Sequence, residues 1–247
     1  MIQDRVIYDL GFHNGDDTHF YLAKGYRVIA VEANEKLVAE GRVRFAGEIA
    51  SGQLVLIHKA ISSEPGELKF YIHRSNSDWS SCHYDIVTSD GSEPLVVSVS
   101  ATTLHALYEE YGVPHYLKVD IEGADVFAVK QLAEHATKPK FVSFETSRRD
   151  FAALFSYLYV AGYRQYQLVN QANNHGLKAE VATLEGDRLD YTFSKFSSGL
   201  YGDDLPADRW QAFEETLSRY LKYKELKQID NKQLGLGWVD VHAKFDA

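Results

Sequence analysis

Three acidic residues and one lysine stand where the strands of an α/β sheet are expected to end. Residues 116–120 form a short apolar run whose alternation puts Lys118 and Asp120 on one face, with Glu122 just past its end. Glu145 ends the next expected strand. Carboxylates placed there could take a proton from an acceptor or orient it, with Lys118 setting the local charge. Ion pairing that simply neutralises the lysine near the core is the alternative.

A glycine-containing turn and a strand-end acid form a second candidate site. Residues 9–15 (DLGFHNG) follow the first expected strand, and glycines there let the backbone turn tightly and approach a ligand. Glu32 ends the second expected strand, where a carboxylate can accept hydrogen bonds from both hydroxyls of an adenosine ribose. The pattern therefore predicts an adenosine-containing ligand.

The spacing of this turn favours S-adenosylmethionine over a nicotinamide dinucleotide. A pyrophosphate prefers G-x-G-x-x-G, whereas this turn is G-x-x-x-G followed by Asp16 and Asp17. Two carboxylates at a helix start would repel a diphosphate and tolerate a sulfonium and an ammonium, although both could also be helix caps that need no ligand. The predicted donor-binding residues follow successive strands and are Asp9, Gly11, Asn14, Gly15, Asp16, Thr18, Glu32, Ala33, Asn34, Ala60 and Ile61.

A long loop between two further expected strands is a candidate acceptor site. The strands at 67–73 and 95–99 have no helix between them, so we expect a β-hairpin excursion with a loop at 74–94. Trp79 offers a flat apolar surface and nearby serines offer hydrogen bonds. A plain surface loop is the alternative interpretation. The predicted acceptor residues are Trp79, Ser80, Ser81 and His83.

Histidines and the single cysteine give weaker signals. His13, His58 and His83 fall in ligand-side loops and could act as bases near neutral pH. No closely spaced histidine pair is present and Cys82 has no partner cysteine, so we predict no bound metal. A magnesium clamp built from the three strand-end acids is the alternative.

The elements that must position these residues alternate between strand and helix. Strands expected at 5–10, 27–31, 54–58, 116–120 and 141–144 are separated by helix patterns, which predicts a mostly parallel, Rossmann-like α/β sheet with helices on both faces. An amphipathic helix at 208–226 precedes a last strand at 237–242. We expect one domain over 1–247, with 74–94 and 170–236 as substrate-side insertions.

Composition narrows the function classes. The 247 residues carry 35 acidic and 26 basic side chains, a net charge of -9 that disfavours nucleic acid as a partner. No apolar run is long enough to span a membrane, and the N-terminus has no signal-peptide pattern. One cysteine suits a reducing compartment, so we expect a cytoplasmic location. The oligomeric state stays open.

The sequence resembles the FkbM family of methyltransferases. The resemblance rests on YDLGFHNGD at 8–16, VEAN at 31–34, TL at 103–104 before a helix, LKVDIEGAD at 117–125 and FE at 144–145, and it covers roughly residues 6–166. Phe12-His13 stands where the family usually has alanine, Asn34 where proline is commoner, and Asp125 where glutamate is commoner. The ending WVDVHA at 238–243 is similar to that of a subset of these proteins.

The resemblance implies a class I methyltransferase fold and S-adenosyl-L-methionine as methyl donor. It also implies O-methylation of a hydroxyl on a sugar, a glycan or a secondary metabolite, so the expected partner is a small-molecule or glycan acceptor. An NAD(P)-dependent oxidoreductase and a non-catalytic module that binds adenosine ligands remain the alternatives.

Overall fold

The computed structural model describes residues 2–146, 150–234 and 237–246. In chain order the elements are β1 (Ile2–Leu10), α1 (Asp16–Ala23), β2 (Arg27–Glu32), α2 (Glu35–Arg44), α3 (Ala46–Ala50), β3 (Leu54–His58), β4 (Ala60–Ile61), β5 (Gly66–Ile72), the 3₁₀ turn η1 (Ser77–Trp79), α4 (Tyr84–Val87), β6 (Leu95–Thr102), α5 (Leu104–Tyr111), β7 (Val113–Val119), α6 (Asp125–Glu134), β8 (Phe141–Glu145), α7 (Phe151–Ala161), β9 (Gln165–Asn170), β10 (Lys178–Ala182), β11 (Arg188–Thr192), β12 (Gln211–Ala212), α8 (Phe213–Leu234) and β13 (Val239–Lys244). Within the described residues, no helix is long and apolar enough to cross a membrane.

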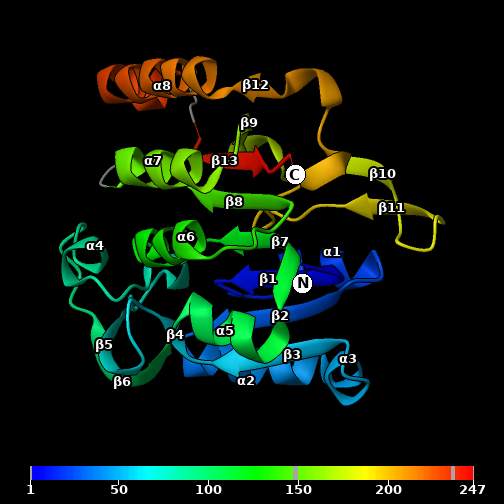
Figure 1. Cartoon of the computed structure of the whole chain (residues 1–247). Helices are drawn as coiled ribbons and strands as arrows, with labels where there is room; N and C mark the ends of the chain where they lie inside the picture. The colour runs from blue at the N-terminus through cyan, green and yellow to red at the C-terminus, as the bar shows by residue number, and fades with distance from the viewer. Residues whose placement is uncertain (1, 147–149, 235–236, 247) are drawn as a thin grey trace.

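One eight-stranded sheet runs through the molecule in the order β3-β2-β1-β7-β8-β13-β9-β12 (Figure 1). The strands from β3 to β8 in that order are parallel, β13 is antiparallel to both β8 and β9, and β12 is antiparallel to β9. Helices cover both faces. The predicted mostly parallel, Rossmann-like fold is therefore confirmed, and its parallel strands bring their carboxyl ends to one edge.

The central strands are apolar because both faces of the sheet are covered. Residues 6–10 of β1 are all buried, as expected for a parallel strand between two helix layers. Side-chain caps fix two of the helix starts: Asn34 accepts from the N–H of Lys36 at the start of α2, and Thr103 accepts from the N–H of Ala106 at the start of α5. These two helices therefore begin at a capped turn shortly after β2 and β6.

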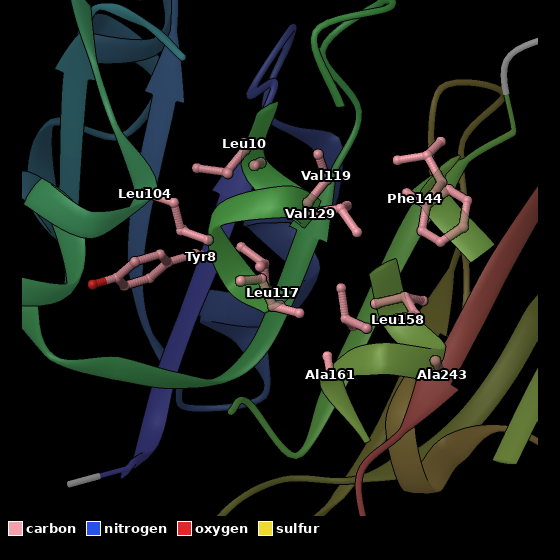
Figure 2. Close-up of a cluster of buried hydrophobic side chains, with 14 of the residues drawn as sticks. Tyr8, Leu10, Leu104, Leu117, Val119, Val129, Phe144, Leu158, Ala161 and Ala243 are labelled. Atoms are coloured by element: carbon pink, nitrogen blue, oxygen red, sulfur yellow. The ribbon is translucent and has the colours of Figure 1, made fainter. Parts of the chain in front are cut away.

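The core lies on both faces of the sheet. On one face, α5, α6 and α7 pack against β1, β7, β8 and β13 through side chains such as Leu104, Leu117, Val129 and Leu158 (Figure 2). The opposite face is rich in aromatic rings from α1 and from the segment after β9, which pack on Ile7, Val28 and Tyr116 among others. Truncating a fully buried leucine such as Leu117 to alanine would cost about 2–5 kcal/mol.

The predicted hairpin excursion is present with two additions. Strands β5 and β6 pair in antiparallel register from Gly66 with Ala101 to Ile72 with Leu95, and the short β4 adds a parallel third strand beside β6. The loop at 74–94 contains η1 and α4. This small sheet lies beside the carboxyl ends of β1 and β2, at the lower left of Figure 1.

The segment between β9 and β13 differs from the sequence prediction. The helix expected at 208–226 begins at Phe213 as α8 and ends at Leu234, because 207–209 form a 3₁₀ turn and 211–212 an edge strand. Phe213, Leu217 and Tyr220 do pack on the core, whereas Leu221 is 45% exposed. The hairpin β10–β11 was not predicted; its Val181 and Tyr191 pack near Phe20 on the aromatic face.

Candidate functional site

A cavity of about 530 Å³ lies at the carboxyl ends of β1, β2, β7 and β8. Its size is within the range of about 300–1,000 Å³ that is usual for small-ligand sites. Twelve of the predicted donor, acceptor and catalytic residues line it, namely Gly11, Asn14, Glu32, Ala33, Ala60, Ile61, Trp79, Ser80, Lys118, Asp120, Glu122 and Glu145. The structure thus brings donor, acceptor and catalytic candidates into one space.

The glycine turn is held against the end of β7. The N–H groups of Gly11 and Phe12 both donate to the carbonyl of Val31, at 3.0 and 3.1 Å. Gly11 has φ +94°, and a Cβ built on it would lie 1.8 Å from the carbonyl oxygen of Asp120. Only glycine fits this contact, so the donor turn and the strand-end acid are fixed relative to each other.

Glu32 is buried and already oriented by the backbone. Its two carboxylate oxygens accept the N–H of His13 at 2.9 Å and the N–H of Asn34 at 2.8 Å. Burial raises the pKa of this carboxyl, while the two N–H donors oppose the rise. Each oxygen keeps a further lone pair for a ligand, and the group faces the cavity as a ribose-binding acid should.

Lys118 lies at the centre of a buried charge network. Its ammonium is 3.2 Å from Asp9, 3.3 Å from Asp17 and 3.6 Å from Asp120. Burial alone would lower the pKa of Lys118, but the three carboxylates raise it well above its usual value. The lysine therefore stays charged and forms the ion pairs that the sequence indicated as its alternative role. It also lines the cavity, beside Asp120.

Several predicted donor residues support the cavity wall from outside. Asp9 is fully buried and accepts a hydrogen bond from the hydroxyl of Thr18 at 2.6 Å, so both residues lie behind the glycine turn and support it. Asp16 faces away and pairs with Arg44 at 2.7 Å. Gly15, at φ +80°, packs against aromatic rings at the start of α1, and Asn34 caps α2. These five residues do not line the cavity.

The strand-end acids form a compact group. Asp120, Glu122 and Glu145 each place a carboxylate oxygen within 4.8 Å of the other two. Burial and the Asp120 carboxylate raise the pKa of both glutamates well above the usual value. Such groups exchange protons nearer neutral pH than ordinary carboxylates.

The backbone at Glu122 is strained and held in place. Its φ of 48° lies in the left-handed region that side chains rarely adopt. Its carbonyl oxygen accepts the hydroxyl of Ser81 at 2.6 Å, and the N–H of the following Gly123 donates to Asp125 at 3.0 Å. Strain of this kind at a cavity wall is typical of functional positions.

The loop after β5 contributes the other wall of the cavity. Trp79 is 43% exposed and Ser80 accepts the N–H of His73 at 3.2 Å. Ser81 is fully buried and acts on Glu122 through its hydroxyl, while His83 starts α4 and stacks on Phe127. Neither Ser81 nor His83 lines the cavity.

Cys82 lines the cavity, but its thiol is a poor nucleophile. Burial raises the pKa of this thiol to about 11, so little of it is ionised near neutral pH.

Sequence reasoning missed part of the wall. Gln171, Trp238 and Asp240 close the side next to β8, and Gln171 donates a hydrogen bond to Asp240. Residues 195–198 also line the cavity, and the N–H of Ser198 donates to Asp17 at 2.7 Å. The similarity of residues 238–243 to the ending of a subset of the family was a sequence signal that could have identified Asp240. No sequence pattern in residues 195–198 indicates that they line a site.

Solved structures give only weak similarity. A precorrin-6y C5,15-methyltransferase from Geobacter metallireducens GS-15 is 8% identical with a TM-score of 0.43, covering 100% of this chain and 82% of that one. An O-methyltransferase from Bacillus cereus in complex with SAH is 13% identical with a TM-score of 0.33, covering 75% and 71%. At such scores these likenesses carry no argument. No curated protein matches significantly.

The family comparison is decisive. The model of the methyltransferase FkbM domain matches residues 9–165, which include the glycine turn, Glu32 and all three strand-end acids. The donor fits the geometry, since the cavity offers a buried carboxylate that two backbone N–H groups already orient for a ribose. The cofactor is S-adenosylmethionine, and the chain belongs to the FkbM family of methyltransferases.

Proposed function

We propose that this protein transfers a methyl group to a hydroxyl oxygen of a small-molecule or glycan acceptor, such as a sugar or a secondary metabolite. The observation that carries the proposal is the meeting of Glu32 with the acids Asp120, Glu122 and Glu145 in one cavity. A non-catalytic module would need these acids to be displaced or the acceptor space to be blocked. Both the acids and the space are there.

The donor would be held at the glycine-turn end. Glu32 would accept both ribose hydroxyls, and Gly11 lets the backbone approach the ligand closely. Asp17, which lines the cavity, adds negative charge on the side of a cationic ligand. When bound, S-adenosylmethionine supplies a methyl group activated by its sulfonium charge.

The acceptor would enter between the loop after β5 and the start of β13. Trp79 and Trp238 line the cavity and are 43% and 51% exposed, so they offer flat apolar surfaces to a ring. Ser80 and the protonatable glutamates add hydrogen-bonding groups. This combination suits a neutral, hydroxyl-rich molecule better than an anionic one.

Glu122 is the proposed general base. Asp120 forms an ion pair with the Lys118 ammonium at 3.6 Å. The pKa of Glu122 is raised by burial and by Asp120, so its carboxylate is a stronger proton acceptor than an ordinary glutamate. As the acceptor oxygen takes the methyl group, its proton passes to Glu122, while Asp120 and Glu145 orient the hydroxyl.

The test is a product analysis followed by one substitution. The enzyme is incubated with methyl-labelled donor and a panel of glycosides and hydroxylated metabolites, and the linkage of the labelled methyl is read by NMR. With the acceptor found, Glu122→Gln should reduce kcat about 100-fold or more while S-adenosylhomocysteine affinity stays unchanged. The matched control is Glu134→Gln on the exposed side of α6. A methyl group on nitrogen or carbon would refute the proposed chemistry.

We also propose a cytoplasmic setting, which the single, unpaired Cys82 supports.

A further inference from the structure

His13 connects two parts of the cavity that are far apart in sequence. Its backbone N–H donates to Glu32 at 2.9 Å, so its main chain orients the donor-binding acid. Its imidazole Nε2 lies 2.8 Å from Asp78 and 3.0 Å from the hydroxyl of Ser77, both in η1 on the facing loop. With φ at 49°, His13 is in the left-handed region, which lets main chain and side chain serve these two contacts.

The facing segment, residues 75–81, is organised from behind by His73. The Nδ1 of His73 accepts the N–H groups of Ser75 and Asn76 at 3.3 and 3.0 Å, and its ring packs edge-on against Trp79 with centroids 5.5 Å apart. At its far end, Ser81 bridges to Tyr71 of β5. The segment is therefore anchored on the small sheet, and His13 provides a contact across the cavity.

A third segment meets the same imidazole. The ring of Phe196 packs edge-on against His13 with centroids 5.5 Å apart, and the charge of Lys195 acts on Asp78. Both residues line the cavity. The imidazole is thus the point where the glycine turn, the segment 75–81 and the segment 195–198 come together.

We infer that His13 is a positioning residue that latches the segment 75–81 over the donor end of the cavity. Because the same residue orients Glu32, closure of the segment and the geometry of the ribose acid are coupled. The latch goes beyond the choice of acceptor: it governs donor retention whichever hydroxyl is methylated.

The latch should depend on pH. Burial lowers the pKa of His13, but the Asp78 and Glu32 carboxylates raise it above the usual value against the opposing charge of Lys118. The hydrogen bond from His13 in turn lowers the pKa of Asp78, with help from Lys195. The charged pair therefore exists from above the lowered pKa of Asp78 up to the raised pKa of His13, and it weakens as the pH rises through the latter.

Hydrogen exchange on the full chain tests the latch without any ligand. Several N–H groups of the segment are bonded within it, such as those of Trp79 and Ser80, and report its opening. His13→Gln should lower protection of the segment about two- to five-fold near pH 6, a small effect because the pair is partly exposed. Asp78→Asn should do the same, and the double variant should add little.

Donor binding gives the second readout. The dissociation rate constant of S-adenosylhomocysteine should rise by a similar two- to five-fold in His13→Gln near pH 6, and the difference from wild type should shrink towards pH 9. His19→Gln, an exposed histidine on α1 bonded to Tyr191, is the matched control. Unchanged protection in His13→Gln, an equal loss in the control, or a pH-independent effect would overturn the latch. Failure of S-adenosylhomocysteine to bind wild type would instead refute the donor site.

Discussion

Replacing Glu32 with alanine should weaken donor binding strongly. The wild-type carboxylate is buried and held by the N–H groups of His13 and Asn34, so its remaining lone pairs are directed before a ligand arrives. Hydrogen bonds to a charged group contribute about 1.5–3 kcal/mol each, which sets an upper limit of roughly 3–6 kcal/mol for two ribose hydroxyls. Water can enter the space left by the side chain and recover part of this. We expect affinity to fall about 10- to 100-fold.

Calorimetric titration with S-adenosylhomocysteine measures this loss, and a 2′-deoxy analogue shows its origin. If Glu32 binds the ribose, the penalty of Glu32→Ala should be clearly smaller for the analogue, which has one hydroxyl fewer. Glu40→Ala on the exposed face of α2 is the control for the loss of an acid. A folded Glu32→Ala protein with wild-type affinity, or with the same penalty for both ligands, would refute the ribose assignment.

The affinity should also depend on pH with a definite sign. Burial raises the pKa of Glu32, and only its ionised form accepts two hydroxyls while also accepting two N–H groups. Donor affinity should therefore decrease as the pH falls through this raised pKa. The decrease should be absent in Glu32→Ala, which separates it from the protonation of other acids in the cavity.

The remaining predictions concern the strand-end acids and the turn. Turnover should survive exhaustive chelation, because a side chain can take the acceptor proton. If activity is lost and added Mg²⁺ restores it, Asp120, Glu122 and Glu145 are metal ligands. Asp120→Asn should lower the pKa of Glu122, because burial and then the Asp120 carboxylate raise it in the wild type, so the acid limb of the kcat/KM profile should move to lower pH. If that limb does not move and kcat falls more than about 100-fold, Asp120 is the base instead. Gly11→Ala should destabilise the fold by more than about 2 kcal/mol in urea titrations, since its Cβ would lie 1.8 Å from a carbonyl oxygen; wild-type stability would contradict the close contact between turn and strand.

Residues at the ends of parallel strands were predictable because the fold fixes their place. Once the alternation of strands and helices indicates a parallel sheet, Glu32, Asp120 and Glu145 must lie at the same edge, whatever the details of packing. The structure places all three in the cavity. Residues one or two positions further on were less certain. Asp16 and Asp17 are neighbours, yet a helix turns about 100° per residue, and only Asp17 faces the cavity.

The wall formed by residues 195–198 could not be predicted for a different reason. It follows the hairpin β10–β11 and comes to the site because the rings on either side of it, Phe193 and Tyr201, pack against Phe20 and Tyr21 of α1. Those are contacts between segments about 175 residues apart, as in the hydrogen bond from Tyr191 to the backbone of Asp16. Local periodicity carries no information on such pairings. The same holds for His13, whose role depends on Asp78 across the cavity.

The two side chains with left-handed backbone conformation among the described residues are His13 and Glu122, and both line the cavity. This conformation costs a non-glycine residue about 1–2 kcal/mol, and glycine would adopt it at both positions without that strain. Each residue is nevertheless held there by contacts beyond its own turn, His13 by Glu32 and Asp78, and Glu122 by the hydroxyl of Ser81. Stability does not explain the choice. Backbone strain of this kind clusters at functional sites, and it agrees with the two roles proposed above: closure of the segment 75–81 for His13 at the donor end, and acceptance of the hydroxyl proton for Glu122 at the acceptor end.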